Sequence, residues 1–264
     1  MQAASLAGEL LLQLRRGAVT DTPTDSEALR TAGDRDANRA IMNLLANERP
    51  EDSLLSEEAA DDQRRLIAER VWIIDPLDGT REFGEQDSAG VWRDDFAVHV
   101  ALWERGHGLT LGVVGLPARG VIYSSDARTV VPPSPAGPLR IAVSRTRPPG
   151  FIAALESAGS AKLLPMGSAG VKVMAVVSGE ADAYIHAGGQ YQWDSAAPVA
   201  VALAAGLVAT RLDGSPLKYN VPELLLPDLV VCHPDRADEV RLLLDAAGFG
   251  LDGASGAGAA ESAG

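Results

Sequence analysis

The segment Trp72-Ile73-Ile74-Asp75-Pro76-Leu77-Asp78-Gly79-Thr80 joins an apolar run to two carboxylates, a proline and a glycine. Residues 71–74 have the β-branched and aromatic content of a buried strand, and Pro76 and Gly79 then turn the chain. Asp75 and Asp78 would lie at the strand's end, where two unpaired negative charges are costly to bury without a cation. Hard oxygen ligands, with no Cys or His close by in sequence, favour magnesium, manganese or calcium over zinc. The segment predicts a divalent metal site.

Three further acidic residues are expected, like this aspartate pair, where an apolar element meets a turn. They are Asp34, Glu57 and Asp194. Asp194 is also well placed to be the N-cap of an Ala-rich helix, and capping alone would account for that residue.

The elements expected before residue 124 form an α+β arrangement that could position these carboxylates. Leucines at helical spacing predict a helix over 3–16, and a second helix is expected over 34–46. Strands are predicted from apolar and β-branched content over 53–55, 71–74, 96–102, 111–116 and 120–123.

The segment 124–138 is rich in proline and small polar residues and is the expected lobe boundary. Helices and strands then alternate, with strands predicted over 139–143, 181–186 and 229–232 and helices over 150–158, 171–177 and 196–205. The pattern predicts an α+β lobe over 1–130 and an α/β lobe over 139–249. The Gly-, Ala- and Ser-rich tail over 250–264 is expected to be disordered.

The composition excludes some classes of function. The chain has 264 residues, 46% of them hydrophobic, which suffices for a large core. A net charge of −13 and a pI near 4.7 argue against a nucleic-acid-binding surface. No apolar run is long enough to span a bilayer, and a single cysteine, Cys232, excludes an intrachain disulfide. A cytoplasmic protein that does not bind membranes is the default expectation.

These residues resemble the signatures of the inositol monophosphatase-like superfamily of magnesium-dependent, lithium-sensitive phosphatases. The signatures are a Glu57-Glu58 pair after a strand, the Asp75–Thr80 run followed by Phe83, and Trp193-Asp194 opening an Ala-rich helix. Three other segments are similar to the CysQ branch of 3′(2′),5′-bisphosphate nucleotidases, as found in actinobacteria: Arg81-Glu82-Phe83, Val143-Ser144-Arg145 and residues 167–172.

The resemblance implies a layered αβαβα sugar-phosphatase fold with mixed sheets and an active site between the lobes, at the strand ends. It implies two or three Mg²⁺ per site, with Mn²⁺ as a substitute. The metal ligands it implies are Glu57, Asp75, Asp78, Asp194 and the carbonyl of Leu77. Asp78 and Asp194 are implied to hold the metal that faces the leaving group.

The resemblance also implies catalytic and substrate-binding residues. Asp34 orients Thr80, which relays a proton with Glu57, while the backbone amides of Gly79 and Thr80 hold the phosphate. Gly189 and Gln190, in a loop expected after residue 186, are implied to contact the nucleoside. A bisphosphate substrate needs a second anion site, for which the sequence leaves several candidates open: Arg81, Arg145, Ser168 and Lys172. Gly167, next to Ser168, is a further predicted substrate-binding residue.

The activity implied is removal of the 3′-phosphate from adenosine 3′,5′-bisphosphate (PAP) or 3′-phosphoadenosine 5′-phosphosulfate (PAPS), giving AMP or adenosine 5′-phosphosulfate, in sulfate assimilation. Hydrolysis of inositol monophosphate or fructose 1,6-bisphosphate is the alternative within the superfamily. A metal- or nucleotide-binding sensor is the alternative from another class, although all the matched ligands and Thr80 are present. A homodimer is common among such proteins, but no motif here requires one.

Overall fold

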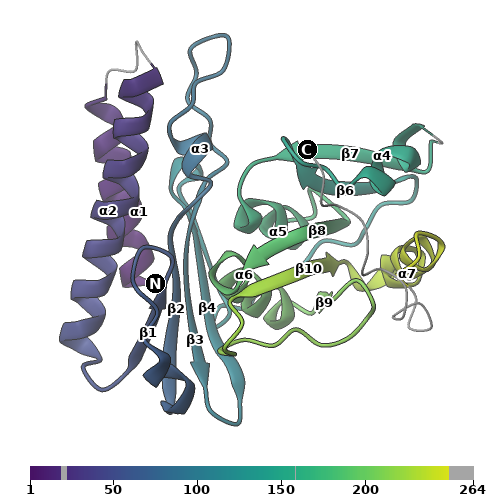
Figure 1. Cartoon of the computed structure of the whole chain (residues 1–264). Coiled ribbons are helices and arrows are strands. Elements are labelled where there is room, and N and C mark those ends of the chain that lie inside the picture. The colour runs from purple at the N-terminus through teal and green to yellow at the C-terminus, as the bar shows by residue number, and fades with distance from the viewer. Residues whose placement is uncertain (19–22, 158, 250–264) are drawn as a thin grey trace, which may run out of the picture.

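In the computed structural model, the described residues are 1–18, 23–157 and 159–249. They form five layers, αβαβα, with helices on both outer sides, two sheets, and a helical layer between the sheets (Figure 1). The predicted fold class is confirmed. The predicted disordered tail lies outside the described residues.

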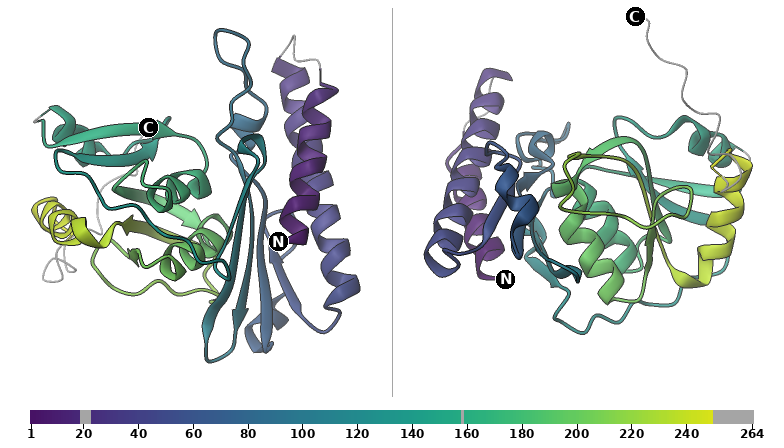
Figure 2. Two further views of the ribbon diagram at one scale, coloured as in Figure 1. Left: turned by 180° about the vertical axis from the view of Figure 1, so that it is seen from behind. Right: turned by 60° about the horizontal axis from the view of Figure 1, so that its bottom comes forward.

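The first outer layer is a pair of long helices, α1 (Gln2–Arg16) and α2 (Pro23–Glu48), which lie side by side against one face of the first sheet (Figure 2). Helix α2 begins at Pro23 rather than at the predicted residue 34, with a proline in its first turn. Gly33 does not end the helix. The apolar side of α2 is buried on both sides of this glycine, at Leu29 before it and at Ala37 and Ile41 after it.

The first sheet has the order β1-β2-β3-β4-β5, with β1 and β2 parallel and the other pairs antiparallel. Its strands are β1 (Ser53–Ser56), β2 (Arg70–Asp78), β3 (Ala97–Glu104), β4 (Gly108–Leu116) and β5 (Val121–Ser124). Strand β2 is buried on both faces. Val71 and Ile73 face the central helices, whereas Trp72 and Ile74 face α1 and α2.

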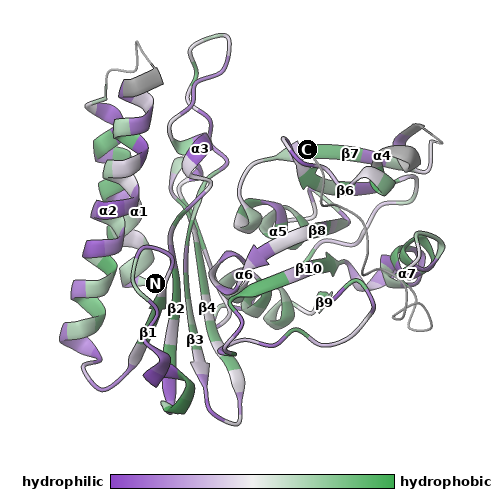
Figure 3. Cartoon of the chain, viewed as in Figure 1, coloured by the Kyte–Doolittle hydropathy of each residue, from purple (hydrophilic) through white to green (hydrophobic). Residues whose placement is uncertain are grey.

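The second sheet has the order β7-β6-β8-β10-β9, with β6 parallel to β7 and β8, and β10 antiparallel to β8 and β9. Its strands are β6 (Leu139–Ser144), β7 (Ala161–Met166), β8 (Ala183–Tyr191), β9 (Val208–Thr210) and β10 (Leu225–Cys232). Figure 3 shows β10 largely hydrophobic, whereas the arrowhead of β8 is hydrophilic. Residues 125–138 link the two sheets, and the division into separate lobes stays a prediction.

Helices α5 (Ala169–Val177) and α6 (Gln192–Ala204) fill the space between the sheets. Helices α4 (Gly150–Ser157) and α7 (Ala237–Ala246) cover the outer face of the second sheet, where Ile152, Val240 and Leu244 are buried. The one-turn helix α3 (Thr80–Phe83) follows β2.

Strands β7 and β9 and helix α7 were not predicted from the sequence. Strand β8 also contradicts the expected loop after His186, because β10 pairs with β8 as far as Tyr191. Within the described ranges, no helix is both long and apolar enough to cross a bilayer.

Candidate active site

Three aspartates meet where β2 ends and α6 begins. Carboxylate oxygens of Asp75, Asp78 and Asp194 lie within 4.8 Å of one another, which is close enough for them to share a metal ion. Strand β2 contributes the first two across an irregularity in its pairing with β3, so the strand continues through Pro76 instead of ending at Ile74. The structure thus brings together residues that are more than a hundred positions apart in the chain.

The first turn of α6 places Asp194, although the residue is not the predicted N-cap. The helix begins at Gln192, and Tyr191 is its N-cap. Asp194 is the third helical residue, and its Oδ2 accepts a hydrogen bond of 2.6 Å from the Tyr191 N–H. This reach back to the cap is one half of a capping box, which orients the carboxylate toward the cluster. Trp193 lies in the central core.

Glu57 and Asp34 complete the acidic rim. Glu57 follows β1, its N–H donates to the Ile74 carbonyl at 3.2 Å, and its carboxyl shares a hydrogen bond with that of Asp75. Asp34 lies inside α2 and not at a turn, which corrects the prediction. Its Oδ1 lies 3.1 Å from the Thr80 hydroxyl, which is also 3.0 Å from the Leu77 carbonyl.

The site carries more negative charge than its own side chains neutralise. Among the described residues, the three aspartates form a single ion pair, which joins His99 Nε2 and Asp78 Oδ2 at 3.3 Å. Burial lowers the pKa of His99, so this partner is a weak source of positive charge. Burial and the neighbouring carboxylates raise the pKa of Asp75 well above its usual value, that of Asp194 to about 7 and that of Glu57 to about 7. Oxygen ligands crowded in this way suit a hard divalent cation.

Asp78 is held by the N-terminal turn of α5. Its Oδ2 accepts hydrogen bonds from the Ser168 hydroxyl at 2.5 Å and from the Gly170 N–H at 2.8 Å. The ring of His99 lies against the same carboxylate, and its Nδ1 is 3.2 Å from the Trp193 carbonyl. The orientation of Asp78 therefore depends on residues from the second half of the chain.

A polar pocket of about 240 Å³ adjoins the aspartates. Most of the predicted substrate residues line it: Asp78, Arg81, Gly167, Ser168, Lys172, Gly189, Gln190 and Asp194. Gly79 lies instead between β2 and α3, at a φ of 88° that suits glycine, and Thr80 is the first residue of α3. The pocket is large enough for one small phosphorylated molecule and lies directly beside the carboxylates.

Three predicted cationic ligands have partners within the protein. Arg145 is absent from the pocket wall and is bound to Glu82 and Asp95. The ammonium of Lys172 is buried and donates to the carbonyls of Ser168 at 2.6 Å and Gly167 at 3.2 Å. Arg81 is exposed and paired with Glu85 at 2.7 Å.

Sequence reasoning missed further residues of the pocket wall, among them Glu82, Ser144, Thr146, Arg147 and Tyr184. It also missed Asp95, although its position just before an apolar strand resembles that of the other acidic residues that were singled out. Arg147 is the important omission, because the described residues give it no ion pair and it faces the pocket.

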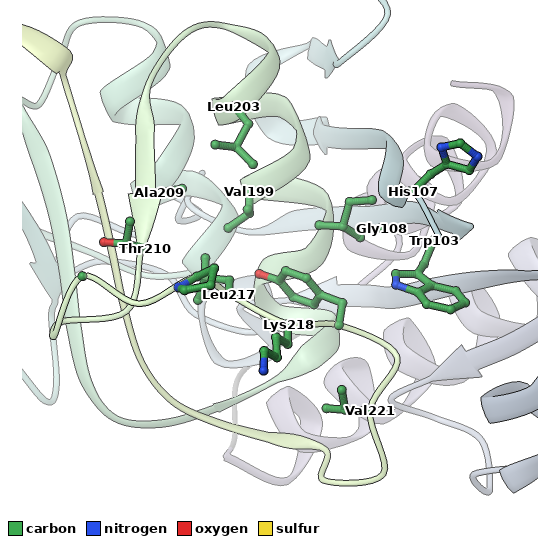
Figure 4. Close-up of a pocket in the computed structure, with 14 residues that line it drawn as sticks. Trp103, His107, Gly108, Val199, Leu203, Ala209, Thr210, Leu217, Lys218 and Val221 are labelled. Carbon is green, nitrogen blue, oxygen red and sulfur yellow. The ribbon is translucent and has the colours of Figure 1, made fainter. Parts of the chain in front are cut away.

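A larger cavity of about 620 Å³ lies elsewhere, between the β3–β4 turn, α6, β9 and residues 214–221 (Figure 4). Its wall is mainly apolar and includes Trp103, Val199, Leu203 and Leu217. Among the described residues that line it there is no Asp or Glu. None of the predicted site residues lines this larger cavity, so cavity volume alone does not locate the candidate active site.

The fold and the acidic site together define a layered phosphatase of the inositol monophosphatase type. The chain belongs to the inositol monophosphatase family, whose sequence profile matches residues 1–243. An inositol monophosphatase from Staphylococcus aureus superposes with a TM-score of 0.75 at 20% identity, covering 91% of each chain, and so shares the fold.

Two groups of relatives have names that are more specific than that of the family. The chain is 51% identical over 247 residues to the 3′-phosphoadenosine 5′-phosphate phosphatase of Mycobacterium tuberculosis, covering 91% of this chain and 88% of that protein. It is 31% identical over 241 residues to the 3′(2′),5′-bisphosphate nucleotidase CysQ of Escherichia coli, covering 85% and 94%. The structure of CysQ from Bacteroides thetaiotaomicron is similar, with a TM-score of 0.70 at 29% identity over 87% of this chain and 93% of that one. The predicted CysQ resemblance is confirmed.

Proposed function

We propose that this protein is a magnesium-dependent phosphomonoesterase that removes the 3′-phosphate of PAP or PAPS, giving AMP or adenosine 5′-phosphosulfate. The observation that carries the proposal is a cluster of carboxylates with raised pKa values opening into a pocket that also holds an arginine, Arg147. The activities for which the mycobacterial and CysQ relatives are named support the same substrate class.

In this proposal, two Mg²⁺ ions are held by the acidic site, and a third, weaker site or replacement by Mn²⁺ is compatible with it. Glu57, Asp75 and the Leu77 carbonyl would hold the first, and Asp75, Asp78 and Asp194 the second. Asp75 can serve both because a carboxylate has two oxygens. When bound, the ions would neutralise phosphate oxygens, lower the pKa of a water molecule and stabilise the departing alkoxide.

The protein's own groups would then orient the reactants and move the proton. Thr80 is fixed by Asp34 and the Leu77 carbonyl, so its hydroxyl has a set direction. Burial raises the pKa of Asp34 to about 6, so this carboxylate can exchange a proton near neutral pH. Glu57, as a proposed ligand of the first ion, would be deprotonated when that ion is bound. The amides of Gly79 and Thr80 would hold the phosphate beside them.

We assign the second phosphate or the sulfate-bearing end to Arg147, with Ser144 and Thr146 as neutral hydrogen-bond donors on the same wall. Arg145 is a poorer candidate than the sequence indicated, because two carboxylates already bind its guanidinium. Gly189 and Gln190 remain proposed contacts of the nucleoside, and Gln190 Oε1 is buried without a partner among the described residues. Ser168 remains a candidate for the second anion site.

The test is phosphate release from PAP, PAPS, inositol 1-phosphate and fructose 1,6-bisphosphate, each with and without Mg²⁺, compared as kcat/KM. The proposal predicts Mg²⁺-dependent release with a clear preference for the nucleotides. A preference for the inositol or sugar phosphate would overturn the substrate assignment, and no release from any substrate would favour a metal- or nucleotide-binding sensor.

A further inference from the structure

A buried charged cluster joins the two halves of the molecule beside the active site. Glu82 in α3 and Asp95 just before β3 come from the half that contains the first sheet, whereas Arg145 follows β6 in the second sheet. Arg145 Nη1 donates to Glu82 Oε1 at 3.1 Å, and its Nη2 is bound to Asp95 Oδ2. We call these three residues the clasp. Both carboxylates are buried, so the guanidinium between them prevents the repulsion that two like charges would otherwise cause.

Asp95 also fixes the turn that leads into α5. The oxygen that binds Arg145 accepts a hydrogen bond of 2.7 Å from the Gly167 N–H. The turn is packed closely against α3, because a Cβ atom on Gly167 would lie 2.4 Å from the Glu82 Cδ. A side chain at position 167 would therefore have to displace the Glu82 carboxylate, so the position of this turn is tied to both carboxylates of the clasp.

The Gly167–Ser168 turn is strained, and it contacts the predicted metal ligand Asp78 directly. Ser168 has a φ of 51°, which is uncommon for a residue with a side chain and must be maintained by its surroundings. In this conformation its hydroxyl reaches Asp78, as does the Gly170 N–H. A chain of contacts therefore runs from Arg145 through Asp95 and the turn to Asp78.

We propose that Asp95 and Arg145 are positioning residues, which hold the Gly167–Ser168 turn so that Asp78 presents its carboxylate to the metal. This inference rests on the proposed function only in its kinetic test, which needs PAP to be a substrate. It assigns Arg145 a role different from anion binding and gives a role to Asp95, which touches no predicted metal ligand directly.

The experiment compares Asp95→Asn and Arg145→Gln with the unaltered protein. A partner that orients a metal ligand through other groups affects metal affinity or activity about 10- to 100-fold. We expect kcat/KM on PAP to fall by about that factor, mainly through kcat, and the affinity for Mn²⁺ alone to fall about tenfold. Amides 167–170 should exchange hydrogen faster in the metal-free variants, because their anchor is lost.

A matched control comes from Asp182 and Arg140 at the opposite end of the second sheet. Asp182 accepts hydrogen bonds from the Arg140 N–H at 2.8 Å and from its guanidinium at 2.6 Å. Its side chain is 1% exposed, compared with 5% for Asp95. Asp182→Asn removes a similar buried ion pair, so it should cost comparable stability while kcat/KM and Mn²⁺ affinity stay within about twofold.

Unchanged Mn²⁺ affinity and unchanged exchange at 167–170 in Asp95→Asn would overturn the proposal, as would an equal loss of Mn²⁺ affinity in Asp182→Asn. If Asp95→Asn does not fold, Arg145→Lys serves instead, and it should lose less Mn²⁺ affinity than Arg145→Gln because one charge remains. Absence of PAP hydrolysis by the unaltered protein would contradict the proposed function, whereas the Mn²⁺ and exchange measurements would still decide the role of the clasp.

Discussion

Two groups of buried or partly buried carboxylates lie next to each other, and they are neutralised in different ways. In the clasp, Glu82 and Asp95 share the guanidinium of Arg145, and the pKa of Asp95 is lowered by the Gly167 N–H and Arg145 in spite of its burial. In the aspartate cluster, Asp75 and Asp194 have no such partner among the described residues, and their pKa values are raised. One guanidinium lies between the two clasp carboxylates, although burial still raises the pKa of Glu82. The aspartate cluster has no such partner among the described residues, and we propose that it binds a cation instead.

The largest expected effect follows from removing a charge from the aspartate cluster. Asp75→Asn should lower kcat by about 1000-fold or more, because the bridging carboxylate contributes several kcal/mol of cation-dependent stabilisation. The metal-free variant should be at least as stable as the original, because the substitution relieves repulsion within the cluster. The same change in the clasp, Asp95→Asn, should reduce stability. Thermal unfolding without metal measures the change in stability of both variants. A clear loss of stability in Asp75→Asn would contradict the proposed difference between the aspartate cluster and the clasp.

The proton relay beside the cluster should give the next largest effect. Thr80→Val removes the hydroxyl shared by Asp34 and the Leu77 carbonyl and should lower kcat about 100-fold or more, as expected for a lost acid–base group. Thr80→Ser keeps the hydroxyl and is the control, with activity within a few fold. Steady-state kinetics on PAP measures both, and equal activity of the Val and Ser variants would exclude the relay.

The contrast between the two neighbouring arginines gives a smaller effect. Arg147→Gln should lower kcat/KM on PAP about tenfold, which corresponds to about 1.4 kcal/mol, through a higher KM and with little change in stability. A substrate without the 5′-phosphate, 3′-AMP, should be affected much less. Arg145→Gln should instead lower stability and affect both substrates alike. Equal losses on PAP and 3′-AMP in Arg147→Gln would remove this arginine from the second anion site.

The smallest expected effect is on the pH dependence of stability without metal. The pKa of Asp194 is about 7 and that of Asp34 about 6, both above the values near 4 of an unfolded chain. The folded state therefore keeps protons that the unfolded state loses, so this contribution is complete below pH 4 and is lost as the pH rises to 7. Urea unfolding should show stability falling by on the order of 2 kcal/mol between pH 5 and 7.5. With Mg²⁺ present the fall should shrink or reverse, whereas a metal-free protein that gains stability over this range would contradict the raised pKa values.

The sequence predicted that Asp75 and Asp78 lie together at the end of a strand, because these two residues, Leu77 and Thr80 lie within six positions of one another. Local pattern was also enough for the core strands of the first sheet, where β-branched residues cluster. The resemblance to a known family then linked these residues to Asp194, which local pattern explained only as a helix cap.

The errors concern contacts between distant parts of the chain. The pairing of Arg145 with Asp95 joins residues fifty positions apart, and neither shows a local signal of it. The length of β8 is set by its pairing with β10, which overrides the turn-forming tendency of Gly188 and Gly189. Helix α2 likewise continues through a glycine because burial of its apolar side stabilises it. In each case a tertiary interaction outweighs the local preference.

We propose that a divalent cation neutralises the aspartate cluster in place of a protein side chain. Calorimetric titration of the metal-free protein with Mg²⁺ at pH 7, repeated in buffers of different ionisation enthalpy, measures the number of protons released on binding. Because Asp75, Asp194 and Glu57 have raised pKa values, Mg²⁺ binding should release protons, and Asp75→Asn should bind much more weakly. Absence of Mg²⁺ binding, or binding without proton release, would contradict the account.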